Sequence, residues 1–345
     1  MKKLIYLMLI TLVACGKKDI KKNSDKIFVS NATKTFESFL FNTYLDRNFD
    51  TLPLKGQIKD QALLWPGDYW PFNKGSINKR WNSPGHPGFD TDSPSKEKVK
   101  ALSLEELSAL SPSEKFDLLR GDYQYTLKRE VEILANPSAE DWEGMCQGWA
   151  MATINHHEPT PKNLMNPDGI QIPFGSSDIK ALLSYYYAFG VTPETEQVGL
   201  RCDSTSYQDA NCLDDLSPAT FHLLLTNKLG RDGTSFIADI APLQQVWNHP
   251  VYSYESEIIY KNKKFVHLKT KVIYIDEADN NYWIPILGSP HQFITKRQYE
   301  YILDLSEEGK ILEGKWISSE RPDFIWYTRK ISEFEGPFNL LTSLL

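Results

Sequence analysis

The chain has 345 residues, of which 41% are hydrophobic, so it is long enough for one large domain or two smaller ones. Its net charge is −7 and its pI is near 5.6. Nucleic acids bind basic surfaces, so this acidic balance argues against a nucleic-acid partner.

The N-terminus has the pattern of a secretion signal. Met1-Lys2-Lys3 precedes an apolar run that ends at Ala14 and is too short to span a bilayer. The sequence from Leu12 to Cys15 resembles a bacterial lipobox, whose cysteine is lipidated. We therefore expect a lipoprotein signal peptide at 1–14 and a protein anchored to a membrane of the bacterial cell envelope through Cys15.

Gly16 follows the cysteine, which favours the outer membrane, on its periplasmic or surface face. Residues 15–31 are polar and rich in lysine, and we interpret them as a tether of about 50 Å at full extension. The remainder, 32–345, is predicted to form a single catalytic domain.

Aromatic residues are concentrated in the segment 65–81, which also contains two prolines. Such a segment does not form a regular helix, so we expect a packed loop. Tyr69 and Trp70 in this loop are candidates for lining a binding cleft. A purely structural aromatic clamp is the alternative.

Helices are predicted from residue 103 to about 134. Ser103 and Ser113 are each followed by acidic residues, as is typical of helix N-termini. Apolar residues then recur at helical spacing, at Phe116, Leu118, Leu119, Tyr125, Leu127, Val131 and Leu134. A further helix is expected from Ser176 or Ser177 to Gly190.

Between these helices, Cys146 is predicted to begin a helix that ends before Pro159. Free backbone N–H groups and the helix dipole at such a position lower the pKa of a thiol and supply donors for an oxyanion. A small buried cysteine behind a helix cap is the alternative interpretation.

The cysteine count bears on this choice, because the sequence has four cysteines. With Cys15 lipidated, Cys202 and Cys212 bracket a polar loop and are a plausible disulfide in an oxidising compartment. Cys146 is then left over as an unpaired thiol, which favours a functional role.

From Phe221 onward the pattern changes to strands, and residues 221–226 and 234–239 are predicted to form a hairpin. His222 and Asp239 would face each other across it, directly or diagonally depending on the register. They are therefore candidates for the base and its orienting group beside a Cys146 nucleophile. A structural His–Asp bridge within the sheet is the alternative.

Further strands are expected at 257–260, 265–276, 299–305, 310–316 and 324–328. The fold class is therefore α+β, with a helical N-terminal half that carries the nucleophile helix and an antiparallel sheet in the C-terminal half. The order Cys, His, Asp is shared by papain-like peptidases and by the transglutaminase core, so we expect a papain-like or transglutaminase-like catalytic arrangement.

Several separated motifs resemble the elicitor-type transglutaminase family, which includes Phytophthora cell-wall enzymes. The segment Val246-Trp-Asn-His-Pro-Val251 looks like the elicitor segment of that family, although His249 stands where that segment carries glutamine. The other motifs are Tyr69-Trp-Pro with Ser76-Ile-Asn and Arg80-Trp81, Leu110-Ser-Pro-Ser-Glu-Lys-Phe-Asp-Leu-Leu, Gly144-Met-Cys-Gln-Gly-Trp, and Gly314-Lys-Trp with Pro322-Asp-Phe-Ile-Trp.

This resemblance implies a protein-glutamine gamma-glutamyltransferase that moves an acyl group from peptidyl glutamine to an amine through a Cys146 thioester. The partners it implies are proteins or peptides that carry glutamine and lysine. His222 would accept the thiol proton, and Asp239 would orient the imidazole of His222. Tyr69, Trp70, Trp149 and Trp247 are the expected substrate-binding residues.

The sequence requires no cofactor, but the resemblance makes calcium possible. Oxygen ligands for it are available in two acidic clusters, Asp203/Asp209/Asp214/Asp215 and Asp276/Glu277/Asp279. Neither cluster has the spacing of a known calcium loop, so the metal ligands are left open. A cysteine peptidase or glutamine deamidase with the same triad, and a non-catalytic surface binding module, remain alternative functions.

Overall fold

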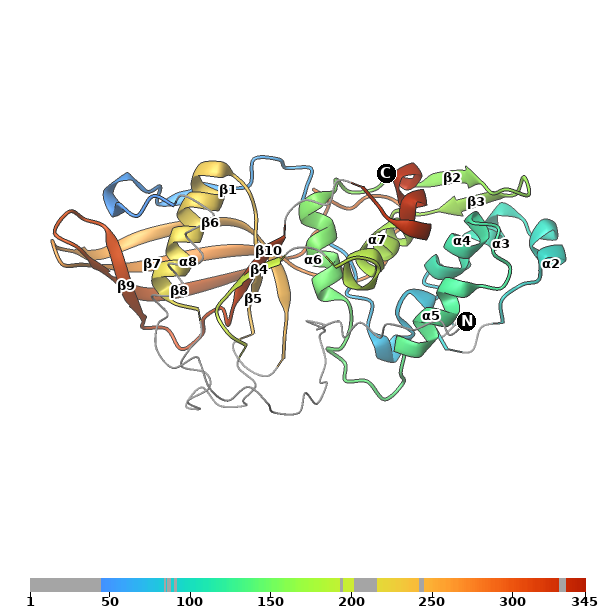
Figure 1. Cartoon of the computed structure of the whole chain (residues 1–345), viewed down its shortest axis with the longest axis horizontal. Helices are drawn as coiled ribbons and strands as arrows, with labels where there is room; N and C mark the ends of the chain where they lie inside the picture. The colour runs from blue at the N-terminus through green and yellow to red at the C-terminus, as the bar shows by residue number, and fades with distance from the viewer. Residues whose placement is uncertain are drawn as a thin grey trace, which may run out of the picture.

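The computed structural model describes residues 45–345 except 84, 86–87, 90–91, 193–194, 202–215, 242–244 and 329–332. The predicted signal peptide, the tether, Cys15, Cys202 and Cys212 therefore lie outside the described residues. The fold is α+β: helices gather at one end of an elongated molecule and an antiparallel sheet forms the other end (Figure 1). Within the described residues, no helix is both long and apolar enough to cross a bilayer.

The helical end begins with four short helices, and three of them, α3 to α5, lie within the predicted helical range 103–134. Ser103 and Ser111 each form a capping box, with Glu106 and Glu114 respectively, so the second cap lies two residues before the predicted Ser113. The helices are α2 (Lys96–Ala101), α3 (Leu104–Ser108), α4 (Pro112–Leu119), α5 (Thr126–Leu134), α6 (Cys146–Asn155), α7 (Ser176–Tyr185), α8 (Pro218–Leu224) and α9 (Leu341–Leu344).

Helix α6 lies between the helical end and the sheet (Figure 1) and packs against α7 and β6. Gly148 permits the close approach of α6 and α7, because a Cβ at this position would lie 2.0 Å from the carbonyl oxygen of Ser184. Eight consecutive α6 residues from Cys146 to Thr153 are buried. The helix that carries Cys146 is thus enclosed on all sides.

The main sheet has eight strands in the order β4-β10-β5-β6-β7-β8-β9, with β1 paired to β6, and all its pairs are antiparallel. A separate pair, β2 and β3, lies among the helices. The strands are β1 (Lys55–Gln57), β2 (Lys162–Met165), β3 (Gln171–Phe174), β4 (Thr195–Val198), β5 (Ile237–Asp239), β6 (Asn248–Lys261), β7 (Phe265–Ile275), β8 (Ile294–Leu305), β9 (Ile311–Trp316) and β10 (Ile325–Thr328).

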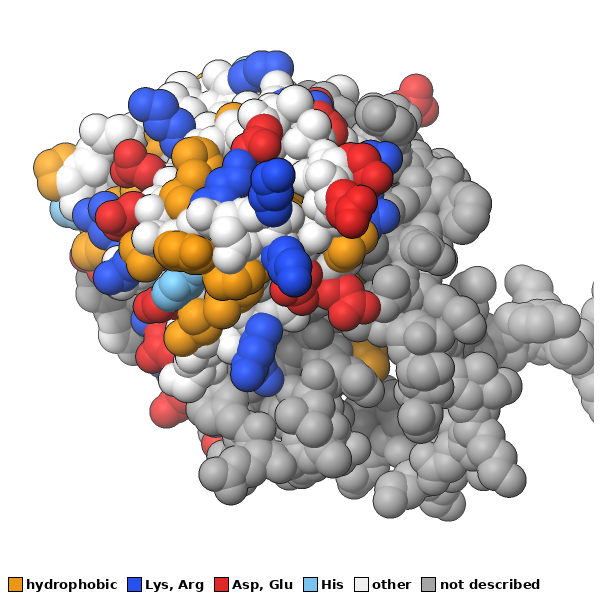
Figure 2. Space-filling model, turned by 90° about the vertical axis from the view of Figure 1, so that its left-hand side faces the viewer, with side chains coloured by type: hydrophobic (Ala, Val, Ile, Leu, Met, Phe, Trp, Pro, Cys, Tyr) orange, Lys and Arg blue, Asp and Glu red, His pale blue; other side chains and the backbone are white. Residues whose placement is uncertain are grey.

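Helix α8 covers one face of this sheet. Its Phe221 ring contacts the rings of Tyr299 and Trp316 at centroid distances of 5.5 and 5.6 Å. Alternate residues of β7, such as Leu268 and Val272, are buried on the covered face, as strand periodicity requires. Beyond α8, at the end of the sheet viewed in Figure 2, apolar side chains lie exposed among charged ones; β6 contributes Ile258, Ile259 and Tyr260.

The predicted hairpin of 221–239 is wrong. Residues 218–224 form α8, and the chain continues as π-helical turns from Leu225 to Asp232. Pro218 occupies the first helical turn, where its missing N–H costs nothing, and the apolar run that follows is buried as a helix. A short apolar run cannot by itself distinguish a strand from a buried helix. Only the last residues, Ile237–Asp239, form a strand as expected.

A buried ion pair joins two helices of the helical end. Lys115 Nζ of α4 lies 2.7 Å from Asp178 Oδ2 of α7, and both side chains are fully buried. Asp178 also accepts hydrogen bonds from the backbone N–H of Gly175 and from Trp81 Nε1. This carboxylate is therefore satisfied by three donors from separate parts of the chain.

We predict that Lys115→Met lowers the free energy of unfolding at pH 7 by about 3–5 kcal/mol, because it leaves the Asp178 carboxylate buried without its cation. The double variant Lys115→Met/Asp178→Asn should recover part of this loss, since no buried charge remains. Denaturant unfolding of the three proteins tests this. A Lys115→Met protein within about 1 kcal/mol of the wild type would contradict it.

Candidate functional site around Cys146 and the end of strand β6

Cys146 is the first residue of α6 and is almost fully buried. The preceding residues pack tightly against the aromatic loop: Met145 N–H donates to the Tyr69 carbonyl at 2.6 Å. Gly144 is required there, because a Cβ would lie 2.5 Å from the same carbonyl oxygen. The N-cap residue, Met145, makes no side-chain hydrogen bond to this helix N-terminus.

Cys146 is disulfide-bonded in this structure, and its partner is not among the described residues. The prediction of an unpaired Cys146 thiol is therefore wrong. That prediction came from counting cysteines, and a count cannot say which of them are brought together by the fold. The predicted bond between Cys202 and Cys212 lies outside the described residues.

An asparagine amide faces the sulfur of Cys146. Asn248, at the start of β6, donates from Nδ2 to Sγ at 3.6 Å, and the Val246 carbonyl oxygen lies 3.8 Å from Sγ. Trp326 of β10 donates from Nε1 to Asn248 Oδ1 at 2.7 Å. Because an indole nitrogen only donates, this contact fixes the amide with its NH₂ group toward the sulfur.

Asp239 lies opposite Asn248 in the β5–β6 ladder. Its Oδ1 accepts the backbone N–H groups of Trp247, at 2.9 Å, and Ala241, at 3.1 Å, while its buried Oδ2 has no hydrogen-bond partner among the described residues. Burial raises the pKa of this carboxyl from 3.8 to about 7. Asp239 thus holds the chain that carries Val246 and Asn248.

The predicted contact between His222 and Asp239 is not formed. His222 lies in α8, fully buried, with Nδ1 2.8 Å from Tyr301 Oη and its ring stacked on Phe49. Burial lowers the pKa of this imidazole to about 3, so it is neutral. The contact required a hairpin, and α8 replaces the strand that was to carry His222.

The predicted substrate-binding residues divide into two pairs. Tyr69 and Trp247 contact each other edge to face at 5.7 Å between ring centroids, and Trp247 lines a cavity. Trp70 and Trp149 are buried in the core, at 1% and 0% exposure, so they do not present a surface to a substrate here.

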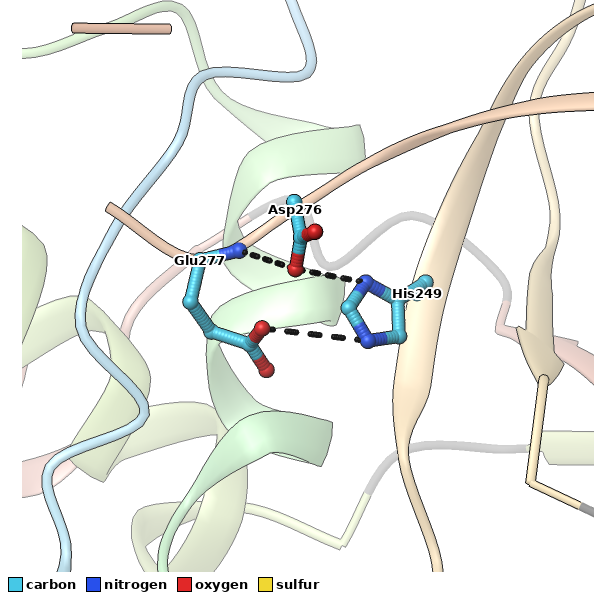
Figure 3. A group of neighbouring side chains, drawn as sticks. All are labelled: His249, Asp276 and Glu277. Atoms are coloured by element: carbon cyan, nitrogen blue, oxygen red, sulfur yellow. Dashed lines mark hydrogen bonds and ion pairs between the residues drawn. The ribbon is translucent and has the colours of Figure 1, made fainter. Parts of the chain in front are cut away.

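A second group of polar residues begins at His249, the residue that follows Asn248 in β6. The His249 imidazole lies beside the carboxylates of Asp276 and Glu277, at the end of β7 (Figure 3). His249 Nδ1 is 3.8 Å from Asp276 Oδ1, and Nε2 is 3.8 Å from Glu277 Oε2. The His249 ring also contacts Trp149, one helical turn after Cys146, at 6.0 Å between centroids.

Burial lowers the pKa of His249, and it raises the pKa of Glu277 well above its ordinary value, aided by the neighbouring Asp276. Asp279, the third member of the predicted calcium cluster, instead accepts a hydrogen bond from Tyr282 Oη. Calcium takes six to eight oxygen ligands. One imidazole with two carboxylates does not fit that requirement, and the other predicted cluster lies outside the described residues.

Sequence reasoning missed Asn248 and Trp326 as site residues. Both belong to motifs that the sequence analysis singled out, the elicitor-like segment and the Phe-Ile-Trp segment near the C-terminus. Their contact joins residues 78 positions apart. No local pattern signals that pairing.

A sequence profile described as transglutaminase elicitor matches residues 138–263 and 258–334, which together span more than half of the chain. The fold is similar to the crystal structure of the GP42 transglutaminase from Phytophthora sojae, with a TM-score of 0.65 and 21% sequence identity over 90% of this chain and 95% of that chain. None of the curated proteins matches.

Because the pKa of Asp239 is raised in the folded protein, the free energy of unfolding should depend on pH. Between about pH 4 and 7 the unfolded carboxyl has lost its proton while the folded one keeps it, so stability falls as the pH rises through this window. We predict that Asp239→Asn becomes more stable relative to the wild type, by a few kcal/mol, from pH 4 to pH 7. Denaturant unfolding at several pH values measures this difference.

Asp122→Asn serves as the control. Partial burial raises the pKa of Asp122, but hydrogen bonds from Thr126 and Gln124 outweigh it and the net shift is downward. Its carboxylate should therefore stabilise the wild type more as the pH rises. A pH-independent difference for Asp239→Asn would disprove the buried, protonated carboxyl.

Proposed function

Because the chain belongs to the transglutaminase elicitor family, we propose that it is a protein-glutamine gamma-glutamyltransferase in which Cys146 is the nucleophile. The observation that carries this proposal is the position of Cys146 as the first residue of α6, with the Asn248 amide directed at its sulfur. Helix N-termini and N–H donors lower the pKa of a thiol, which favours the reactive thiolate.

In the first half-reaction the Cys146 thiolate attacks the carboxamide carbon of a peptidyl glutamine. The carbonyl oxygen gains negative charge, and the N–H groups at the start of α6 and the Asn248 amide are the donors that we assign to it. The carbon–nitrogen bond then breaks, and the leaving nitrogen takes up, through solvent, the proton that the Cys146 thiol lost on ionisation. Ammonia leaves, and a thioester remains on Cys146.

In the second half-reaction a primary amine, such as a lysine side chain, attacks the thioester carbon. The carbon–sulfur bond breaks, the amide product forms, and the proton lost by the amine restores the Cys146 thiol. Water competes with the amine at this stage. The same thioester would give a glutamine deamidase if water were the acceptor, and attack on a backbone amide would give a peptidase. The acceptor therefore distinguishes these functions, while the first step is shared.

Asp239 is assigned here as a positioning residue. Its hydrogen bonds to Ala241 and Trp247 hold the connection between β5 and β6, which places the Val246 carbonyl and the Asn248 amide at the sulfur. Tyr69 and Trp247, which contact each other beside this connection, are the aromatic residues that we assign to substrate binding.

We predict that the reduced protein incorporates a fluorescent primary amine into a glutamine peptide, and that Cys146→Ala lowers this rate at least about 10³-fold. The oxidised protein should be inactive and should resist iodoacetamide, because Cys146 is then in a disulfide. The assay follows amine label, released ammonia and peptide cleavage together.

Each outcome of that assay has a distinct meaning. Ammonia release without label identifies a deamidase, and peptide cleavage identifies a peptidase. A Cys146→Ala protein with full biological activity, together with a wild-type thiol that reacts sluggishly after reduction, identifies a non-catalytic binding module. His267→Ala is the matched control, because His267 pairs with Glu300 at 2.7 Å, away from Cys146, on the open face of the sheet.

We predict that Asn248→Leu, which keeps the size but removes the N–H donor, lowers kcat about 10²-fold with a smaller change in KM. The pH profile of iodoacetamide labelling should shift to higher pH, because the thiolate loses a hydrogen bond. Trp326→Phe should give a weaker version of both effects, since it only releases the amide. An unchanged labelling profile in Asn248→Leu would remove Asn248 from the site.

A further inference from the structure

The cluster of His249, Asp276 and Glu277 has features that the transferase reaction does not use. One ligand atom from each residue lies within 4.8 Å of the other two. Tetrahedral bonds of about 2.0–2.1 Å to a metal place neighbouring ligand atoms about 3.3 Å apart. Figure 3 shows Asp276 beside Nδ1 and Glu277 beside Nε2 of His249, so the side chains would have to move closer together to share one ion.

The hydrogen bond of His249 selects the nitrogen that can bind a metal. Nδ1 lies 2.8 Å from the Ile275 carbonyl oxygen, which only accepts, so Nδ1 carries the proton. Nε2 then has the lone pair, and Glu277 Oε2 lies 3.8 Å from it. A ring N–H held by a backbone carbonyl is the support that metal-binding histidines usually have.

Asp276 lies beside Nδ1 of His249 and Glu277 lies beside Nε2. Asp276 Oδ1 accepts the backbone N–H of Glu277 at 2.9 Å, and Asp276 Oδ2 accepts a hydrogen bond from Thr295 Oγ1. Glu277 Oε1 is buried and has no hydrogen-bond partner among the described residues. A buried carboxylate oxygen of this kind is costly unless a cation or donor satisfies it.

The cluster opens onto a cavity of about 470 Å³. The titratable residues that line it are Asp276, Glu277, Glu320, Arg297 and His249. Three carboxyl groups against one guanidinium supply more oxygen ligands than permanent cations, which suits a positively charged occupant. The cavity also provides room for the water molecules that complete the coordination of an ion.

We propose that His249, Asp276 and Glu277 form a binding site for a divalent transition-metal ion of the Zn²⁺ class. One imidazole nitrogen and two carboxylate oxygens suit such ions. Calcium and magnesium, in contrast, take oxygen ligands. The site includes the residue after Asn248 and does not use the sulfur of Cys146 as a ligand.

Zn²⁺ is the probe that tests this site, with the oxidised full chain first stripped of metal by a chelator. We expect Zn²⁺ at a hundredfold excess over its Kd to raise the Tm by about 5 °C. Calorimetric titration should give one ion per chain. His249→Gln and Glu277→Gln should each weaken Zn²⁺ binding at least about 10-fold.

His267→Gln is the matched control, because His267 and Glu300 form a histidine–carboxylate pair without a comparable third ligand among the described residues. It should bind Zn²⁺ as the wild type does. Cys146→Ala in the same titration separates the cluster from a thiol site and should also retain binding. None of these readouts depends on transferase activity.

Three results would overturn the proposal. The first is a Zn²⁺ affinity that is unchanged in both His249→Gln and Glu277→Gln, provided that each variant unfolds cooperatively. The second is a Tm increase with Ca²⁺ as large as that with Zn²⁺. The third is binding that disappears in Cys146→Ala and persists in His249→Gln.

Discussion

The contact between the N-terminus of α6 and the start of β6 is the constraint on which the rest of the structure depends. It requires glycine at 144 and 148, where the aromatic loop and α7 approach the helix too closely for a Cβ. It also requires Trp326 to turn the Asn248 amide toward the sulfur of Cys146. Cys146 therefore lies where the helical end packs against the sheet.

Much of the helical end could be predicted from the sequence, because its signals are local. Ser103 with Glu106 marks a helix start within four residues, and the glycine-flanked Cys146 after a polar turn marks another. The β6–β7 hairpin could also be predicted, since alternation fixes which side chains of β7 are buried. In each case a few neighbouring residues determine the conformation.

The features that could not be predicted depend on residues far apart in the chain. His222 faces Tyr301, 79 positions away, and an apolar run that suits a strand is buried instead as α8. The fold determines which cysteines come close enough to form a disulfide. The number of cysteines alone therefore led to the wrong prediction, that the Cys146 thiol is unpaired. Neither propensity nor spacing carries this information.

Two consecutive residues of β6, Asn248 and His249, contact different polar partners. Consecutive side chains of a strand point to opposite faces, so Asn248 reaches the sulfur while His249 reaches Asp276 and Glu277. The two clusters share a backbone without sharing a ligand, and Asp239 fixes that backbone from the neighbouring strand. An ion held by His249 would therefore act on the thiol through the position of β6, because any restraint on residue 249 also restrains the amide at 248.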